Sequence, residues 1–160
     1  MKINISELLK NEVACLKIEF NDKVKGLEET INGCNITENI NFKGTLTKIK
    51  GILHLNGIIM FKYNIDCYRC LENINSSMSI NISEDILDAS RVSHSDDAFT
   101  YEGYYLDMDV ILMNYIMINL PMRQLCSEEC KGLCPTCGQN LNEGKCRCNR
   151  DEFINVQMEV

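Results

Sequence analysis

Apolar and polar side chains alternate along several stretches of the first half of the chain. The alternation has the two-residue period of a β-strand with one buried face. The first stretch covers residues 14–20, and the pattern continues over 36–46. After a turn near Lys50 and Gly51, a long stretch covers 53–65 and a further one covers 74–82. This order predicts an antiparallel β-meander sheet whose apolar face is buried.

A second pattern covers residues 106–121, LDMDVILMNYIMINLP, which are apolar on almost every side. This segment predicts a short buried helix that covers the apolar face of the sheet. Either Asp107 or Asp109 is expected to cap its start, and Pro121 disfavours helical geometry in the residue before it. A shorter helix is expected over residues 6–9, capped by its first residue. The expected fold class is therefore α+β.

Residues 84–102, which lie between the last predicted strand and this helix, carry six acids against a single base. Because little of such a segment can be buried, we expect most of it to form a mobile acidic loop. The acids are Glu84, Asp85, Asp88, Asp96, Asp97 and Glu102, and the base is Arg91.

The whole chain of 160 residues has a formal net charge of −7 and a pI of about 4.9. An acidic surface repels phosphate backbones, so broad, charge-driven binding of nucleic acid is not expected. The start of the chain lacks the uninterrupted apolar run of a signal peptide, and its most apolar run, 110–120, is about half as long as a membrane span. These features predict a soluble, cytoplasmic protein, in a compartment where thiols stay reduced.

Ten cysteines are the strongest chemical signal in the chain, and eight of them fall into four closely spaced pairs. Cys67-Cys70 and Cys134-Cys137 both have the two-residue gap of a zinc knuckle, which aims two sulfur atoms at one ion. Since a structural zinc ion binds four ligands, eight clustered cysteines predict two Zn²⁺ ions. The predicted groups are Cys134, Cys137, Cys146 and Cys148, and Cys67, Cys70, Cys126 and Cys130. The spacing alone also permits other combinations of these pairs.

Other uses of the thiols compete with zinc. Disulfides are disfavoured by the expected compartment, and a thioredoxin-like dithiol would open a helix, which neither knuckle is expected to do. An iron–sulfur cluster stays an alternative, because four thiolates bind one equally well. Cys15 and Cys34 are expected to be free thiols, with Cys15 exposed on the polar face of its strand.

No catalytic arrangement accompanies the cysteines in the sequence. His54 and His94 have no recognisable acidic or nucleophilic partner, and no glycine-rich phosphate loop is present. A zinc ion held by four thiolates also has no open position for water. We therefore expect a protein that is not an enzyme and has no small-molecule substrate.

The expected organisation has three parts. Residues 1–120 form the sheet scaffold, which carries the hairpin with Cys67 and Cys70 at its tip. Residues 121–150 form a C-terminal cysteine-rich zinc module, and residues 151–160 form a tail.

Three motifs, in this order, resemble the YceD family, which is named for large ribosomal RNA subunit accumulation. They are CYRCL at 67–71, INLPM at 118–122 and CKGLCPTCGQNLNEGKCRC at 130–148. The residues that match the first and last family motifs are Cys67, Arg69 and Cys70, and Cys134, Cys137, Asn140, Leu141, Asn142, Cys146 and Cys148. The tail after Cys148 departs from the Asp-Pro-Arg run of many relatives, so no role is transferred to it.

The resemblance implies a non-catalytic factor in ribosome biogenesis that supports the synthesis, processing or accumulation of large-subunit ribosomal RNA. Residues 121–150 carry five bases against three acids, a local charge of +2 that leaves −9 for the rest of the chain. This favours the module as the RNA contact. The candidate contact residues are Arg69, Arg123, Lys131, Lys145 and Arg147. Zinc thiolates would offset much of this charge, so an alternative is a protein–protein adaptor whose acidic surface binds a basic large-subunit ribosomal protein.

Overall fold

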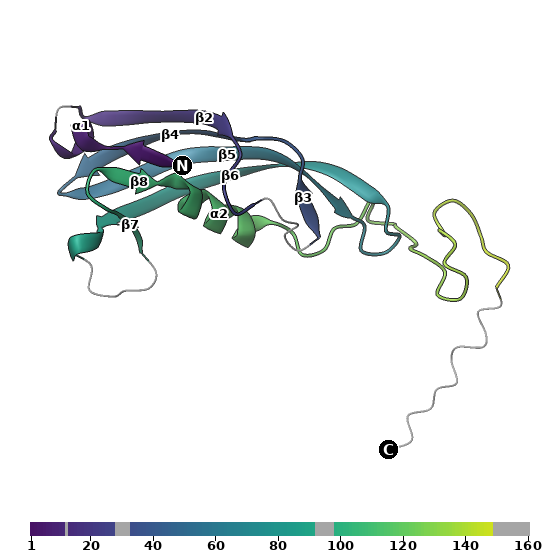
Figure 1. Cartoon of the computed structure of the whole chain (residues 1–160). Helices are drawn as coiled ribbons and strands as arrows, with labels where there is room; N and C mark the ends of the chain where they lie inside the picture. Colours follow the sequence, from purple (N-terminus) through teal and green to yellow (C-terminus); the bar gives the residue numbers. More distant parts are fainter. Residues whose placement is uncertain (12, 28–32, 92–97, 149–160) are drawn as a thin grey trace, which may run out of the picture. The chain divides into compact units, whose positions relative to one another are not determined.

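The structure, a computed structural model, describes residues 1–148 apart from 12, 28–32 and 92–97 (Figure 1). The chain divides into two compact units, residues 1–65 with 75–122, and residues 66–74 with 123–160. The elements are β1 (Lys2–Asn4), α1 (Ser6–Leu9), β2 (Cys15–Asp22), β3 (Cys34–Ile36), β4 (Ile40–Ile49), β5 (Ile52–Asp66), β6 (Asn73–Asp88), a 3₁₀ turn (Ala89–Arg91), β7 (Phe99–Tyr101), β8 (Tyr105–Asp107) and α2 (Met108–Asn119). The tail expected over 151–160 lies outside the described residues.

A six-stranded sheet makes up most of the first unit, with the order β2-β4-β5-β6-β7 and with β3 paired to β5. β2 pairs antiparallel with β4, and β4 pairs antiparallel with β5. β3 also pairs antiparallel with β5, with Cys34 opposite Ile65. The predicted antiparallel sheet is confirmed, although the stretch expected over 36–46 is divided between β3 and β4.

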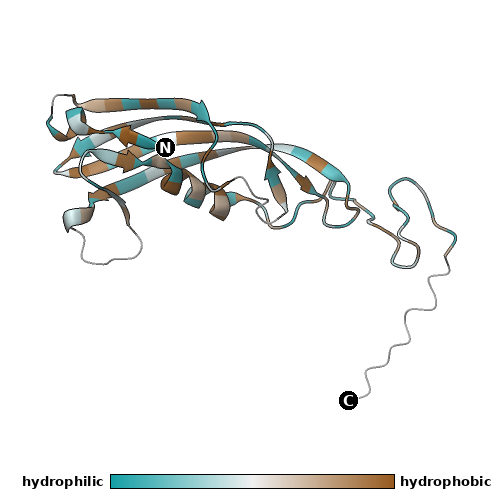
Figure 2. Cartoon of the chain, in the orientation of Figure 1, coloured by the Kyte–Doolittle hydropathy of each residue, from teal (hydrophilic) through white to brown (hydrophobic). Residues whose placement is uncertain are grey.

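The period of two along the strands places one face of this sheet in the core. Leu55 and Ile59 of β5 are fully buried, and they lie opposite Leu46 and Phe42 of β4, which are fully buried as well. Figure 2 shows the resulting bands of hydrophobic and hydrophilic residues along the strands. Each such side chain stabilises the fold by about 1.5–3 kcal/mol through its burial.

α2 begins and ends where the sequence predicts. The side chain of Asp107 is the N-cap and accepts a hydrogen bond from the backbone N of Asp109 at 3.1 Å. Leu120 has extended backbone geometry directly before Pro121, which ends the helix. Among the described residues, no helix has the length and apolar character needed to cross a membrane.

The burial of α2 differs from the prediction, because only one side of the helix is buried. The buried side includes Met108, Ile111, Leu112 and Ile116, whereas Val110, Met117 and Ile118 are exposed. The Oη of Tyr115 donates a hydrogen bond to the carboxylate of Glu84 in β6, which fastens the helix to the sheet. Apolar composition alone did not reveal that, in the described part of the first unit, Val110, Met117 and Ile118 stay uncovered.

The prediction of a mobile acidic loop over 84–102 is wrong for its first part. β6 extends to Asp88, and Ile86 within this stretch is fully buried between the exposed Asp85 and the half-buried Leu87. β7 then pairs parallel with β6, with Ile86 opposite Phe99. The many acids in this stretch obscured the two-residue alternation of exposed and buried side chains, which continues through Glu84, Asp85 and Ile86. Three of the residues considered in the sequence, His94, Asp96 and Asp97, lie outside the described residues.

Two local features near the N-terminus were not predicted correctly. β1 pairs antiparallel with β8 in a separate two-stranded sheet, with Ile3 opposite Leu106. α1 does cover residues 6–9, but Ser6 lies inside it and is not its cap. The Oδ1 of Asn4 accepts the amide of Ser6 at 2.9 Å, so Asn4 supplies the side-chain acceptor that a capping serine would otherwise provide.

Candidate metal centre

The second unit brings eight cysteines together in two groups of four. The first group is Cys67, Cys70, Cys126 and Cys130, and the second is Cys134, Cys137, Cys146 and Cys148. Within each group, all the sulfur atoms lie within 4.8 Å of one another. These are the two combinations that the sequence spacing favours. The hairpin tip at 67–70 therefore shares a group with cysteines far downstream in the chain.

The distances between sulfur atoms match a tetrahedron around a single ion. A zinc ion with Zn–S bonds of about 2.3 Å has S–S edges of about 3.8 Å. The Sγ–Sγ distances are 3.7 Å for Cys67 and Cys130, 3.6 Å for Cys70 and Cys126, and 3.4 Å for Cys134 and Cys146. A disulfide would need about 2.05 Å, and these cysteines are all free thiols.

The two knuckles have the same backbone hydrogen bonds. The amides of Leu71 and Gly138 each donate to the carbonyl of the first knuckle cysteine, at 2.9 Å. One residue further on, the carbonyls of Glu72 and Gln139 each accept from the amide of that first cysteine, at 2.8 Å. The residue after the second cysteine is left-handed in both, with φ of 59° at Leu71 and 72° at Gly138. A glycine marks this turn in the second knuckle, while a leucine occupies it in the first.

Backbone amides favour the thiolate form of the first cysteine in each knuckle. Burial raises the pKa of Cys67, but three backbone amides, including that of Cys126, outweigh burial and lower this pKa to about 6. For Cys134, the amides of Cys137 and Thr136 lower the pKa to about 6. These N–H groups would support a thiolate in the way expected for a metal ligand.

Other cysteines in the same groups show the opposite shift. The hydrogen bond with Cys137, together with burial, raises the pKa of Cys148 to about 12. Four adjacent thiolates repel one another, so some sulfur atoms of a group keep their protons when no cation is bound. A divalent cation would remove this repulsion and release the remaining protons.

Asn142 connects the two groups. Its Nδ2 lies 3.4 Å from the Sγ of Cys130, and this contact is the main cause of the lowered pKa of that thiol. Its Oδ1 accepts the backbone amide of Lys131 at 2.7 Å. Asn142 therefore lies in the loop of the second group and contacts a cysteine of the first. It matches the family motif, but its sequence position did not indicate this role.

The interior of the second unit consists largely of thiols. Cys67, Cys70 and Cys130 are its buried cluster, and the partly buried side chains packed against them are Ile74, Leu125 and Leu133. Burial of so few apolar side chains contributes little to the free energy of folding. Small modules of this kind therefore usually need a metal or a disulfide. The composition of this cluster therefore fits a metal-stabilised unit.

The two other cysteines lie in the first unit and belong to neither group. Cys15 in β2 is exposed, as predicted, and Cys34 in β3 is buried. The Sγ of Cys34 donates to the carbonyl of Pro121 at 3.6 Å, and burial raises the pKa of this thiol. Both are free thiols in the structure.

The basic residues predicted to contact a partner have different surroundings. The Nη1 of Arg69 donates to the carbonyl of Cys130 at 2.9 Å, so this guanidinium ties the first knuckle to the downstream segment. Lys131 and Lys145 line one hollow of about 730 Å³, next to Cys146 and Cys148. Of the two others, Arg123 lies over the ring of Tyr68, and Arg147 is exposed between the last two cysteines.

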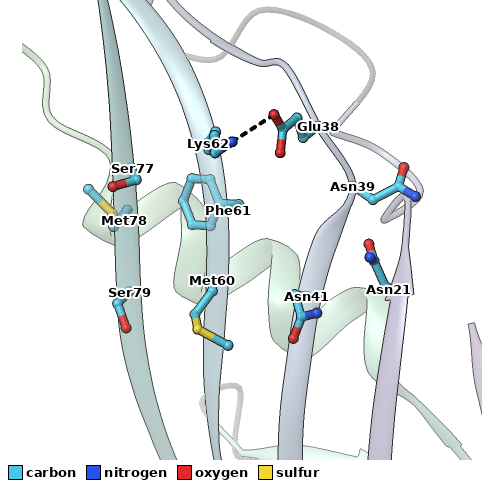
Figure 3. Close-up of a pocket in the computed structure, with 10 residues that line it drawn as sticks. All are labelled: Asn21, Glu38, Asn39, Asn41, Met60, Phe61, Lys62, Ser77, Met78 and Ser79. Carbon is cyan, nitrogen blue, oxygen red and sulfur yellow. Dashed lines mark hydrogen bonds and ion pairs between the residues drawn. The ribbon is translucent and has the colours of Figure 1, made fainter.

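A larger hollow of about 770 Å³ lies on the outer face of the sheet in the first unit, shown in Figure 3. Its polar lining includes Asn21, Asn39, Asn41, Ser77 and Ser79. Among the described residues that line it, the charged side chains are Lys62 and Glu38, which form an ion pair at 2.9 Å. The described lining contains no histidine that could activate a serine hydroxyl, and its one carboxylate is already paired with Lys62. It also holds no group of metal ligands, so this hollow does not compete with the cysteines as a chemical site.

The fold and the cysteine groups define a class of protein in which a largely antiparallel sheet accompanies a cysteine-rich module with two possible metal sites. Residues 55–156 match the family described as "Large ribosomal RNA subunit accumulation protein YceD". This match covers more than half of the chain, and the chain belongs to the YceD family. The resemblance found in the motifs is thereby confirmed.

Two chloroplast proteins show how this chain relates to curated members of the family. It is 25% identical over 130 residues to "Large ribosomal RNA subunit accumulation protein YCED homolog 1, chloroplastic" of Arabidopsis thaliana, covering 62% of this chain and 40% of the relative. It is 25% identical over 135 residues to the protein of the same name in Zea mays, covering 64% and 46%. The chain thus spans less than half the length of either relative. No solved structure matches it.

Proposed function

We propose that this chain is a zinc-binding, non-catalytic factor that supports the synthesis, processing or accumulation of large-subunit ribosomal RNA. The observation that carries the proposal is the assembly of cysteines from the family motifs into two groups of four. The names of the relatives supply the connection with large-subunit ribosomal RNA. The cytoplasmic location expected from the sequence is part of this proposal.

The sulfur geometry supports zinc over the alternatives for these cysteines. All sulfur atoms of a group lie within 4.8 Å of one another, and three of the pairs are 3.4–3.7 Å apart, which suits the space of one ion. An iron–sulfur cluster places two or more iron atoms among its thiolates and so needs a wider group. Four thiolates would complete the coordination of each zinc ion, so the ions would stabilise the unit without activating water.

Contact with RNA would involve a small number of basic side chains. Lys131 and Lys145 line the same hollow in the second unit, and both are exposed. Two ammonium groups in one hollow suit a phosphate of the RNA backbone, and the carboxylate of Glu143 in the same lining offsets one of the two charges. This supports direct RNA binding by the module.

An adaptor function is the second candidate, and the charge distribution favours it. The chain outside residues 121–150 has a formal charge of −9, which suits a strongly basic ribosomal protein. In this case the connection with ribosomal RNA would be indirect, through a protein partner.

The distinguishing experiment uses the zinc-loaded full chain at low salt. It measures mobility shifts of large-subunit ribosomal RNA fragments and, separately, capture of a purified basic large-subunit ribosomal protein. Direct RNA binding should weaken in Lys131→Gln/Lys145→Gln and be unchanged in Lys23→Gln/Lys25→Gln, whose exposed lysines lie in the first unit. Capture of the basic protein with no shift of any RNA fragment would establish the adaptor instead.

A further inference from the structure

The first knuckle exposes an aromatic ring that is stacked against a guanidinium. The side chain of Tyr68 is 59% exposed. The Cζ of Arg123 lies 4.5 Å from the centroid of this ring, within the range of a cation–π contact. The pair presents two flat groups, an aromatic ring and a guanidinium, at the surface of the second unit.

The first cysteine group fixes the backbone on both sides of this pair. The amide of Tyr68 donates to the carbonyl of Gln124 at 2.9 Å, and the amide of Cys126 donates to the Sγ of Cys67 at 3.4 Å. Tyr68 lies between Cys67 and Cys70, and Arg123 directly precedes Gln124. The stacked pair therefore belongs to the framework of the predicted metal site, so it is held in place before any partner binds.

Leu71, on the same knuckle, provides a second observation. It has a φ of 59°, where a residue with a side chain is strained, and it is 64% exposed. The equivalent position in the second knuckle is Gly138, which adopts this conformation without strain. Because its side chain is mostly exposed, Leu71 gains little stabilisation from burial within the chain. An apolar side chain at a strained, exposed position fits a contact with a partner.

The charges of the second unit favour stacking over attraction to phosphates as the main source of affinity. Its described residues contain five bases, Arg69, Arg123, Lys131, Lys145 and Arg147, and five acids, Asp66, Glu72, Glu128, Glu129 and Glu143. Zinc thiolates would make the balance negative, which disfavours tracking along a duplex backbone. Stacking of a base on an aromatic ring or a guanidinium does not depend on net charge.

We infer that Tyr68 and Arg123 form a stacking platform for an unpaired nucleobase of RNA, with Leu71 as an adjoining apolar contact on the same knuckle. The inference rests on the proposed RNA-related function and names its ligand class, single-stranded rather than duplex RNA. Unpaired bases are the part of RNA that aromatic side chains and arginine can reach.

The test uses the absence of tryptophan from the chain. Tyr68→Trp introduces the single tryptophan of the chain, whose indole is excited selectively and keeps the flat stacking surface. Tyr104→Trp is the matched control, because Tyr104 is 53% exposed and lies in the first unit. Each zinc-loaded variant is titrated with a single-stranded RNA of about ten nucleotides and with a perfectly paired RNA hairpin. In Tyr68→Trp, the single strand should quench the indole fluorescence strongly and the hairpin should quench it weakly, whereas neither RNA should affect the control.

Affinity measurements on the otherwise unaltered chain complete the test. Tyr68→Leu should weaken binding of the single strand about tenfold or more. Arg123→Lys, which keeps the charge and removes the flat guanidinium, should weaken it as well. Leu71→Gly should reduce affinity without reducing stability, since it relieves the strained φ. Zinc content and amide exchange identify any variant that loses its fold. Tyr68→Phe keeps the flat aromatic ring, so it should retain binding, and a loss of affinity in this folded variant would contradict stacking.

The outcomes separate this inference from the function on which it rests. Binding of ribosomal RNA fragments that is unaffected by Tyr68→Leu and Arg123→Lys overturns the platform and leaves the proposed function standing. A wild-type chain that binds no RNA, single-stranded or paired, overturns direct RNA binding and the platform together. A fluorescence response to a basic ribosomal protein, but not to RNA, assigns the surface to a protein partner and overturns the nucleobase assignment.

Discussion

The Nδ2 of Asn142 lies 3.4 Å from the Sγ of Cys130. Asn142 belongs to the loop between Cys137 and Cys146, two members of the second cysteine group, whereas Cys130 belongs to the first. An N–H donor directed at a cysteine sulfur favours the thiolate form, which is the form that binds a metal. The loop of one predicted metal site therefore helps to form the other.

Asn142→Asp is expected to weaken metal binding at the first group by about 10- to 100-fold. The aspartate keeps an oxygen that can accept the amide of Lys131, but it replaces the N–H donor with an anion next to Cys130. Competition with a chelator measures the loss, and cadmium NMR of the cadmium-loaded chain assigns it to one site. Gln139→Glu is the control, since it makes the same amide-to-carboxylate change at an exposed position of the same loop. Equal loss in both variants, or loss confined to the second group, would contradict the coupling.

Gly132→Ala is expected to destabilise the second unit by about 1–2 kcal/mol. Gly132 has a φ of 74°, and a Cβ there would lie 3.0 Å from the carbonyl oxygen of Arg69. That oxygen already accepts the amide of Leu133 at 3.0 Å, so the first knuckle has little freedom to move away. Amide hydrogen exchange over residues 123–148 in the zinc-loaded chain measures the effect.

Gly144→Ala is the matched control for this prediction. Gly144 does not have a left-handed φ, and a Cβ there would meet no atom within 4 Å. Alanine also restricts the unfolded chain, so this variant should be neutral or a few tenths of a kcal/mol more stable. Similar destabilisation by both substitutions would show that the close approach of Gly132 to Arg69 is not the cause.

Tyr115→Phe is expected to destabilise the first unit by about 1 kcal/mol at neutral pH, because α2 loses its hydrogen bond to Glu84. Burial and the Glu84 carboxylate raise the pKa of Tyr115 to about 12 from an ordinary value of 10. Folding thus favours the protonated phenol, so this contribution is fully present below pH 10 and is lost as the pH rises through 12.

Urea denaturation of Tyr115→Phe and of the unaltered chain, repeated from pH 7 upward, measures this dependence. The stability difference should be constant up to about pH 9 and shrink above pH 10. Tyr104→Phe, at an exposed position of the same unit, should show no such difference at any pH. A difference for Tyr115→Phe that persists unchanged above its raised pKa would argue against the hydrogen bond.

The sheet was predictable wherever the two-residue period stands out in the sequence. The inward side of β5 follows directly from the positions of Leu53, Leu55 and Ile59, because one strand face must be buried. The end of β6 was not predictable from charge, since Glu84 and Asp85 directly precede the buried Ile86 and the acids obscure the two-residue period that continues to Asp88. The pairing of β1 with β8 depends on residues that are far apart in the chain, and three-residue strands carry too short a pattern to detect.

The number of cysteine groups was predictable because each cysteine pair is local in the sequence, whereas spacing alone left open which pairs combine. A two-residue gap fixes two ligands, and four ligands complete one site, so counting pairs gives two sites. The surroundings of those ligands were not predictable. Asn142 and Arg69 each form a hydrogen bond to Cys130, and these pairings exist only in the folded unit. The left-handed turn at Leu71 contains no glycine that would have indicated it in the sequence.

Metal content is the most direct measurement of the central claim. Elemental analysis and native mass spectrometry of the full chain, purified without chelator, should find two zinc ions per chain. Cys137→Ser should retain one, and amide exchange should rise at residues 134–148 while the sheet of the first unit stays protected. A chain that binds no zinc and keeps its amide protection over residues 126–148 would contradict the account.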